Sequence, residues 1–189
     1  LGYTVTGSDK EESDITNRLT DMGIEIAYNH SASNLKDVEM VVVSTAISED
    51  NLEIKEAKNR SIPVLARAEM LSSLMNTKRG IAIAGTHGKT STTSIVASIM
   101  TEAGLDPTFI NGGIINSFNS NAQLGTGKYL IAEADESDQS FLLLQPSMSI
   151  ITNIEPDHLV NYENSFENLK IAFLDFVKKL PFNGMAIVC

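Results

Sequence analysis

A short glycine-bearing segment is the part of the sequence best suited to phosphate chemistry. Its residues are Gly85, Thr86, His87, Gly88, Lys89, Thr90 and Ser91. Glycines let backbone amides approach phosphate oxygens, and the free amides at the start of a helix donate to them. In a nucleotide site Lys89 would reach the β- and γ-phosphates, and the Thr90 hydroxyl would bind magnesium. The segment is a shortened form of the common loop G-x-x-x-x-G-K-[ST], because Ile83 stands where that pattern has glycine.

Two interpretations of this segment are open. It either binds the phosphates of a nucleotide, or it is a glycine turn that caps a helix and leaves Lys89 in solvent. The apolar strand expected before it and the hydroxyl-rich helix expected after it favour nucleotide binding. The role of His87 is undecided, because its side chain either contacts phosphate or is simply exposed.

Carboxylates follow a second apolar run. The segment Glu133–Asp138 holds four carboxylates in six residues, and such crowding is unfavourable unless a cation or hydrogen-bond donors offset the charge. We therefore predict that Glu133 is a magnesium ligand. Without the phosphate loop, a solvated acidic turn would be the better interpretation.

A histidine follows the next apolar run, in the segment Asn153–His158. A lone histidine after a strand is usually structural or solvated. In a parallel sheet, however, ligands collect outside the carboxyl ends of the strands, and the loop at Gly85, Glu133 and His158 all follow such ends. The three signals together predict one site, with His158 as a further metal ligand.

The elements that must position these residues form two α/β units. Short apolar runs alternate with helical patterns in the first unit, which is typical of parallel α/β folds. The expected strands are 3–6, 25–28, 40–44 and 62–65, and the expected helices are 14–22 and 51–59. This layout predicts a Rossmann-like domain over residues 1–77, with 67–76 as a linking helix.

The second unit is predicted to be a P-loop ATPase-type domain over residues 78–189, with a mainly parallel sheet. Its expected strands are 81–84, 129–132, 148–154 and 185–189. A helix over 90–103 should end at Gly104, and apolar residues at three- and four-residue steps predict an amphipathic helix over 166–180. The segment 111–127, rich in Asn, Gly and Ser, is interpreted as a long connection that faces substrate.

Composition narrows the class of protein. Of the 189 residues, 42% are apolar and 20% are charged, which is typical of a globular chain. The formal charge of −10 disfavours nucleic-acid binding. No apolar run approaches the roughly 20 residues that span a membrane. The single cysteine, Cys189, allows no disulfide framework, which fits a protein of the reducing cytoplasm. Because Leu1 is not methionine and the last apolar segment reads as a strand with nothing after it, we expect a fragment of a longer protein.

In the segments Gly85–Thr90, Glu133–Leu142 and Asn153–His158 the sequence resembles the Mur ligases of bacterial cell-wall synthesis. Weaker support comes from Gly7–Asp9 and Ser44–Ile47. The resemblance implies a three-domain enzyme with a Rossmann-like domain for a UDP-sugar, a central ATPase and a C-terminal domain that helps to bind an amino acid. This chain would hold most of the first domain and the front half of the second.

The resemblance also implies an activity. ATP and Mg²⁺ would drive the joining of L-alanine to the carboxylate of UDP-N-acetylmuramate through an acyl phosphate, in peptidoglycan precursor synthesis. The implied catalytic residues are Lys89, Glu133 and His158. The implied phosphate-binding residues are Gly85, Thr86, His87, Gly88, Lys89, Thr90 and Ser91. The implied metal ligands are Thr90, Glu133 and His158. The family usually has aspartate two residues after this histidine, where the chain has Val160.

Other functions remain open at this point. A related ligase would attach a preformed peptide to the same sugar. A non-catalytic nucleotide-binding module would bind ATP without alanine-dependent release of phosphate. An unrelated phosphotransferase with the same loop would act on a hydroxyl group.

Overall fold

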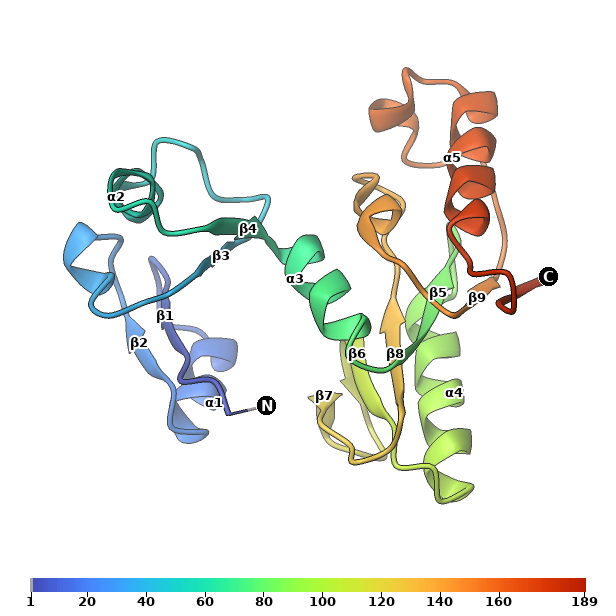
Figure 1. Ribbon diagram of the computed structural model, residues 1–189, viewed down its shortest axis with the longest axis horizontal. Helices are drawn as coiled ribbons and strands as arrows, with labels where there is room; N and C mark the ends of the chain where they lie inside the picture. The colour runs from blue at the N-terminus through green and yellow to red at the C-terminus, as the bar shows by residue number, and fades with distance from the viewer. Residues whose placement is uncertain (1) are drawn as a thin grey trace. The chain divides into compact units, whose positions relative to one another are not determined.

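The computed structural model describes residues 2–189, which form two compact α/β units (Figure 1). The first unit ends at Arg67, and the second is Ala68–Cys189. Helix α3 (Arg67–Met75) therefore belongs, apart from its first residue, to the second unit by its contacts.

Short parallel strand pairs and helices make up the first unit. Strand β1 (Thr6–Ser8) pairs with β2 (Glu25–Ala27), and β3 (Val41–Val43) pairs with β4 (Val64–Ala66). The helical segments of this unit are α1 (Asp14–Asp21), η1 (Ala32–Asn34) and α2 (Leu52–Asn59). Ser13 begins α1 with a capping box, in which its side chain accepts from the backbone of Thr16.

The first strand lies further along the chain than the sequence predicts. The pattern predicts a strand over residues 3–6, but the register of β1 begins with Thr6 opposite Glu25. Tyr3 and Val5 are exposed, and within residues 2–189 no strand pairs with them. Apolar residues form a strand only where a neighbouring strand completes the hydrogen-bond ladder, and here that ladder starts at Thr6.

A six-stranded sheet forms the centre of the second unit, in the order β10-β9-β5-β8-β6-β7. All neighbouring pairs are parallel except β6 and β7, which are antiparallel. The strands are β5 (Arg79–Ala84), β6 (Thr108–Ile115), β7 (Ser120–Gln123), β8 (Tyr129–Glu133), β9 (Met148–Ile151) and β10 (Met185–Val188). The mainly parallel sheet expected from the sequence is confirmed.

The interpretation of residues 111–127 as a long connection is wrong. Strand β6 continues to Ile115, the chain turns, and β7 runs back beside it with Ile110 opposite Ala122. The residue types in this segment have low strand propensity. Hydrogen bonding to the edge of an existing sheet, and the packing of Phe118 on buried Phe109 with ring centroids 4.8 Å apart, outweigh that propensity.

The sheet is covered on both faces. Neighbouring residues of β5 point to opposite sides of the sheet, and they join different core clusters. Ala82 belongs to a core cluster with Phe173 of α5 (Phe166–Lys178). Ile83 belongs to a separate cluster with Ala97 of α4 (Lys89–Glu102). The short helical turns η2 (Ser140–Leu143) and η3 (Leu159–Tyr162) complete the unit. Among residues 2–189, no helix combines the length and apolar character needed to cross a bilayer.

Candidate nucleotide site

Three segments predicted from the sequence to be functional lie at one edge of the second unit. Strands β8 and β9 flank β5 and run parallel to it, so the three carboxyl ends lie at the same edge. The glycine loop follows β5, the acidic run follows β8, and the segment that contains His158 follows β9. This is the edge at which parallel α/β sheets bind ligands.

The loop requires glycine at Gly85. This residue has φ +135°, and a Cβ atom built on it would lie 2.1 Å from Oγ1 of Thr152. Gly88 has φ +81° and is the N-cap of α4, where no side chain caps the first amides. The amides that begin α4 are therefore free to donate to an anion.

Residues after β9 hold the loop in shape. The strand was expected to continue to residue 154 but ends at Ile151, because the chain then turns to bond the loop. Thr86 N donates to the carbonyl of Asn153 at 3.1 Å, and His87 N donates to Asn153 Oδ1 at 2.9 Å. Asn153 Nδ2 donates in return to the carbonyl of His87 at 3.0 Å. The loop conformation thus depends on a residue 66 positions later in the chain.

Lys89 lies folded over the loop. Its ammonium donates to the carbonyl oxygens of Gly85 at 2.7 Å and of Thr86 at 3.3 Å. It also forms an ion pair with Glu136, in which Nζ lies 2.7 Å from Oε2. The side chain of Lys89 is 15% exposed and that of Glu136 is 1% exposed, so little water screens this pair.

The structure brings Thr90 and Glu133 to one short stretch of β6. Gly112 N donates to Glu133 Oε1 at 3.0 Å. A Cβ atom built on the next residue, Gly113, would lie 3.2 Å from Cγ2 of Thr90. Here Glu133 is held by a backbone amide, and the methyl group of Thr90 is the part nearest to Gly113. A carboxylate and a hydroxyl carry oxygen atoms of the kind that magnesium prefers.

His87 and His158 lie at the surface among carboxylates. His87 Nε2 is 3.8 Å from Glu155 Oε2 and 4.0 Å from Asp157 Oδ2. His158 Nε2 is 3.7 Å from Asp157 Oδ2. In the described chain His158 forms no hydrogen bond or ion pair with Glu133, and no group of three His, Cys, Asp or Glu side chains is arranged to hold a metal ion. The role predicted for His158 therefore stays a prediction.

Two other positions named in the sequence analysis lie at the surface. Ser91 lies exposed in the first turn of α4. Val160, where the family usually has aspartate, is 81% exposed in η3.

Sequence reasoning missed the residues that support the loop from behind. Asn153 and Thr152 give no distinctive signal in the sequence, because amide and hydroxyl side chains are common at the ends of strands. In the sequence Glu136 is one of several crowded carboxylates. The apolar residues Ala134 and Phe141, which flank it in the chain and are both buried in the structure, are the local sign that its carboxylate is buried and paired.

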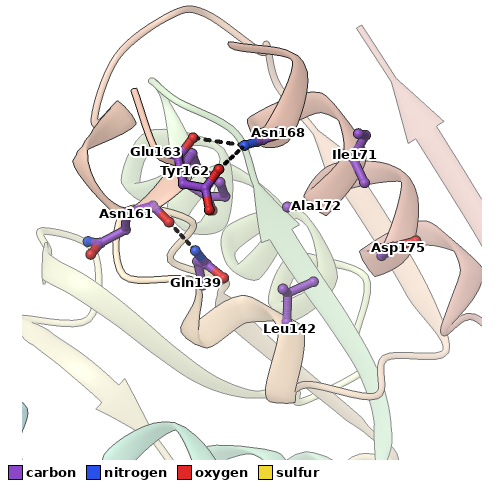
Figure 2. A pocket seen from close by; sticks show the side chains of 9 residues that line it. All are labelled: Gln139, Leu142, Asn161, Tyr162, Glu163, Asn168, Ile171, Ala172 and Asp175. Atoms are coloured by element: carbon purple, nitrogen blue, oxygen red, sulfur yellow. Dashed lines mark hydrogen bonds between the residues drawn. The ribbon is translucent and has the colours of Figure 1, made fainter. Parts of the chain in front are cut away.

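A pocket of about 230 Å³ lies beside α5 (Figure 2). It is lined by Gln139, Leu142, Asn161, Tyr162, Glu163, Asn168, Ile171, Ala172 and Asp175. Figure 2 shows Gln139 donating to the carbonyl of Asn161, and Asn168 donating to the carbonyl of Tyr162. These bonds tie η3 both to the segment before η2 and to α5.

Tyr162 joins this pocket to the acidic segment. Its ring is 3% exposed, and its hydroxyl donates to the backbone carbonyl of Glu136. Burial, followed by the charges of Glu136, Asp138 and Asp135, raises the pKa of Tyr162 to about 12. The hydroxyl thus stays protonated and continues to donate at neutral pH.

A glycine loop between β5 and α4, at the carboxyl edge of a parallel sheet, is typical of α/β proteins that bind nucleotides. Comparison with known proteins agrees with this class. The model of the Mur ligase family catalytic domain matches residues 1–79, and that of the Mur ligase middle domain matches residues 83–189. The chain belongs to the Mur ligase family.

Several known proteins resemble the chain over nearly all of its length. The UDP-N-acetylmuramate–L-alanine ligase of Pelobacter propionicus is 56% identical over 189 residues, which are 100% of this chain and 41% of that protein. The crystal structure of UDP-N-acetylmuramate–alanine ligase from Thermotoga maritima is 34% identical with a TM-score of 0.87, over 97% of this chain and 43% of that one. A murein peptide ligase from Psychrobacter arcticus is 27% identical with a TM-score of 0.85, over 99% of this chain and 44% of that one. The chain thus spans about 41% of the length of the curated relatives it matches.

Proposed function

We propose that the protein containing this chain is an ATP-dependent ligase that joins L-alanine to the carboxylate of UDP-N-acetylmuramate, as an early step of peptidoglycan synthesis. Support comes from the name of the relative that is 56% identical across all 189 residues. The fold agreement with the Thermotoga maritima ligase, at a TM-score of 0.87, also supports it. Because the chain spans about 41% of such relatives, the activity belongs to a longer polypeptide.

In the proposed reaction a carboxylate oxygen of UDP-N-acetylmuramate attacks the γ-phosphorus of ATP, which gives an acyl phosphate and ADP. The amine of L-alanine then attacks the acyl carbon, forms the amide, loses a proton and expels inorganic phosphate. The first step brings two anions together, so its barrier depends on positioning and on neutralising charge. Lys89 and the free amides at the start of α4 are the positive groups that this chain supplies.

The loop residues are proposed to hold the phosphates of ATP. Gly85 and Gly88 would let phosphate oxygens approach the backbone amides. Thr86, His87 and Ser91 belong to the same loop and first helical turn and would line the phosphates. Gly85 lets the loop pack against the end of β9, because the Cβ atom of any other residue would clash with Thr152. The single observation that carries the fit to a phosphate is the start of α4, where Gly88 is the N-cap and no side chain caps the first amides.

Thr90 and Glu133, which carry oxygen atoms of the kind that magnesium prefers, lie near Gly113 and Gly112 of β6. Thr90 and Glu133 would hold one ion, whose chemistry is to neutralise phosphate charge. His158 is proposed as a ligand for a second ion. We propose residues 1–77 as the UDP-sugar domain and residues 78–189 as the ATP domain. The reaction is placed in the cytoplasm, where ATP is abundant, with no nucleic-acid or membrane partner.

A related ligase that attaches a peptide to the same sugar is the second candidate. It is favoured by the likeness to the murein peptide ligase of Psychrobacter arcticus, which is 27% identical with a TM-score of 0.85. The full-length protein should be assayed for ADP release with UDP-N-acetylmuramate and either L-alanine or the tripeptide. Release that depends on L-alanine supports the first candidate, and release that depends only on the tripeptide supports the second. ATP binding without either release would indicate a non-catalytic module.

Replacement of Lys89 tests the role of the loop. We expect Lys89→Ala to lower turnover by about 100-fold or more, since a fixed donor at the developing charge is lost. Binding of the UDP-sugar should be nearly unchanged. Lys179→Ala, at an exposed lysine after α5, is the matched control and should keep full turnover. Turnover of Lys89→Ala within about tenfold of the unmodified protein would contradict the role proposed for the loop.

A further inference from the structure

Glu136 is a buried carboxylate with a fixed backbone. Its exposed fraction is 0%. Its carbonyl oxygen accepts from the Tyr162 hydroxyl and from the backbone amide of Gln139 at 3.0 Å. Asn161 Nδ2 donates to the carbonyl of the next residue, Ser137, at 2.8 Å. The backbone at Glu136 is therefore held from both η2 and η3.

The side chain of Glu136 has one partner. Its Oε2 lies 2.7 Å from Nζ of Lys89. Its Oε1 is buried and has no hydrogen-bond partner in the described structure. Removing one member of a buried ion pair leaves an uncompensated charge, which is strongly unfavourable. Glu136 therefore depends on the ammonium of Lys89.

The ammonium of Lys89 has three N–H donors, and the structure accounts for all of them. They go to Glu136 Oε2, to the carbonyl of Gly85 at 2.7 Å and to the carbonyl of Thr86 at 3.3 Å. An oxygen of a bound phosphate can be contacted only if one of these bonds is released. The two carbonyls are neutral and belong to the loop that surrounds the phosphates, whereas Glu136 is charged and buried. The carbonyl bonds are the ones that can be released at least cost.

We infer that Glu136 is the positioning residue for Lys89. The ion pair with Glu136 persists when nucleotide binds, and the ammonium exchanges its bonds to the loop carbonyls for bonds to phosphate oxygens. Glu136 thus fixes the point about which the lysine turns, and with it the place of the positive charge during phosphoryl transfer. This inference rests on the proposed ligase function and adds a residue to it.

Isosteric replacement in the full-length protein tests this role. Glu136→Gln keeps the shape and an acceptor but removes the charge that holds Lys89. We expect kcat to fall about tenfold to a hundredfold, because a small displacement of a catalytic group costs that much. The dissociation constant for ATP, measured by calorimetry, should change by less than about threefold, because Lys89 remains free to bind phosphate. Glu136→Asp, which restores the charge on a shorter side chain, should recover part of the lost kcat.

The control is Asp138→Asn, which removes a charge from an exposed carboxylate in the same segment. It should leave kcat and ATP affinity unchanged. A kcat of Glu136→Gln within about threefold of the unmodified protein would overturn the inference. Loss of ATP binding in Glu136→Gln would also overturn it, because Glu136 would then build the loop rather than position Lys89. No alanine-dependent ADP release by the unmodified protein would instead overturn the proposed function, and this inference with it.

Discussion

Replacement of the two loop glycines by alanine should have very different effects on stability. At Gly85 the new Cβ atom would lie 2.1 Å from Oγ1 of Thr152, 3.0 Å from the carbonyl oxygen of Asn153 and 3.1 Å from its nitrogen. At Gly88 the nearest atom within 4 Å is Cβ of Thr152 at 4.0 Å, which is ordinary contact. Both residues have positive φ, +135° and +81°, so the comparison separates steric clash from backbone strain.

The magnitudes follow from these distances. Alanine at Gly88 pays for a left-handed conformation alone, about 1 kcal/mol of the free energy of unfolding. Alanine at Gly85 adopts a φ that costs about 1–3 kcal/mol. It must also displace two backbone atoms and a hydroxyl, and overpacking of that kind adds about 1–3 kcal/mol. The expected difference between the two variants is therefore at least about 1 kcal/mol, or a Tm lower by roughly 3 °C or more for Gly85→Ala.

Urea denaturation and thermal melts, followed by circular dichroism, measure both variants. A second test combines Gly85→Ala with Thr152→Ala, which removes the closest clashing atom. Their combined loss of unfolding free energy should be smaller than the sum of the single losses, since the two sites are in contact. Equal losses for Gly85→Ala and Gly88→Ala, or strict additivity with Thr152→Ala, would refute the close approach of loop and strand.

Two further predictions concern ionisation and the metal. The pKa of Tyr162 is raised to about 12 in the folded protein, from about 10 in the unfolded chain. The contribution of the protonated hydroxyl to the free energy of unfolding is therefore fully present below pH 10 and is lost as the pH rises to about 12. Tyr162→Phe should flatten the fall of unfolding free energy over that range, and an unchanged slope in urea melts would refute the assignment. In Gly112→Ala the new Cβ would lie 2.9 Å from Glu133 Oε2. It should displace the carboxylate and weaken the Mg²⁺ dependence of ATP binding about tenfold, whereas Ile114→Ala, at a 60% exposed side chain, should not.

The candidate site could be located from the sequence because its parts are local. A glycine and lysine segment between an apolar strand and a helix is typical of a phosphate loop. Glu133 follows an apolar strand, and parallel strands place their carboxyl ends together. The burial of both faces of β5 likewise follows from the sequence, since residues 81–84 of that strand are a continuous apolar run.

The bounds of β6 and β9 were predicted wrongly because a distant segment of the chain decides where each strand ends. The segment that contains Gly112 and Gly113 lacks strand propensity, yet it extends β6 because β7 turns back and pairs with the end of that strand, with Ile115 opposite Ser120. Strand β9 ends before residue 154 because Asn153 bonds the loop instead of a neighbouring strand. Neither choice is visible in the local pattern of residues.

The sequence by itself determined that this protein has a glycine loop ending in Lys89, two α/β units and carboxylates at the ends of strands. These features depend on residue type, on periodicity and on neighbours within a few positions. Only the tertiary structure decided which carboxylate pairs with Lys89, because Glu133, Asp135, Glu136 and Asp138 are alike as residues. The fold buries Glu136 against the lysine, and in a low-dielectric interior that burial is what makes the pairing obligatory.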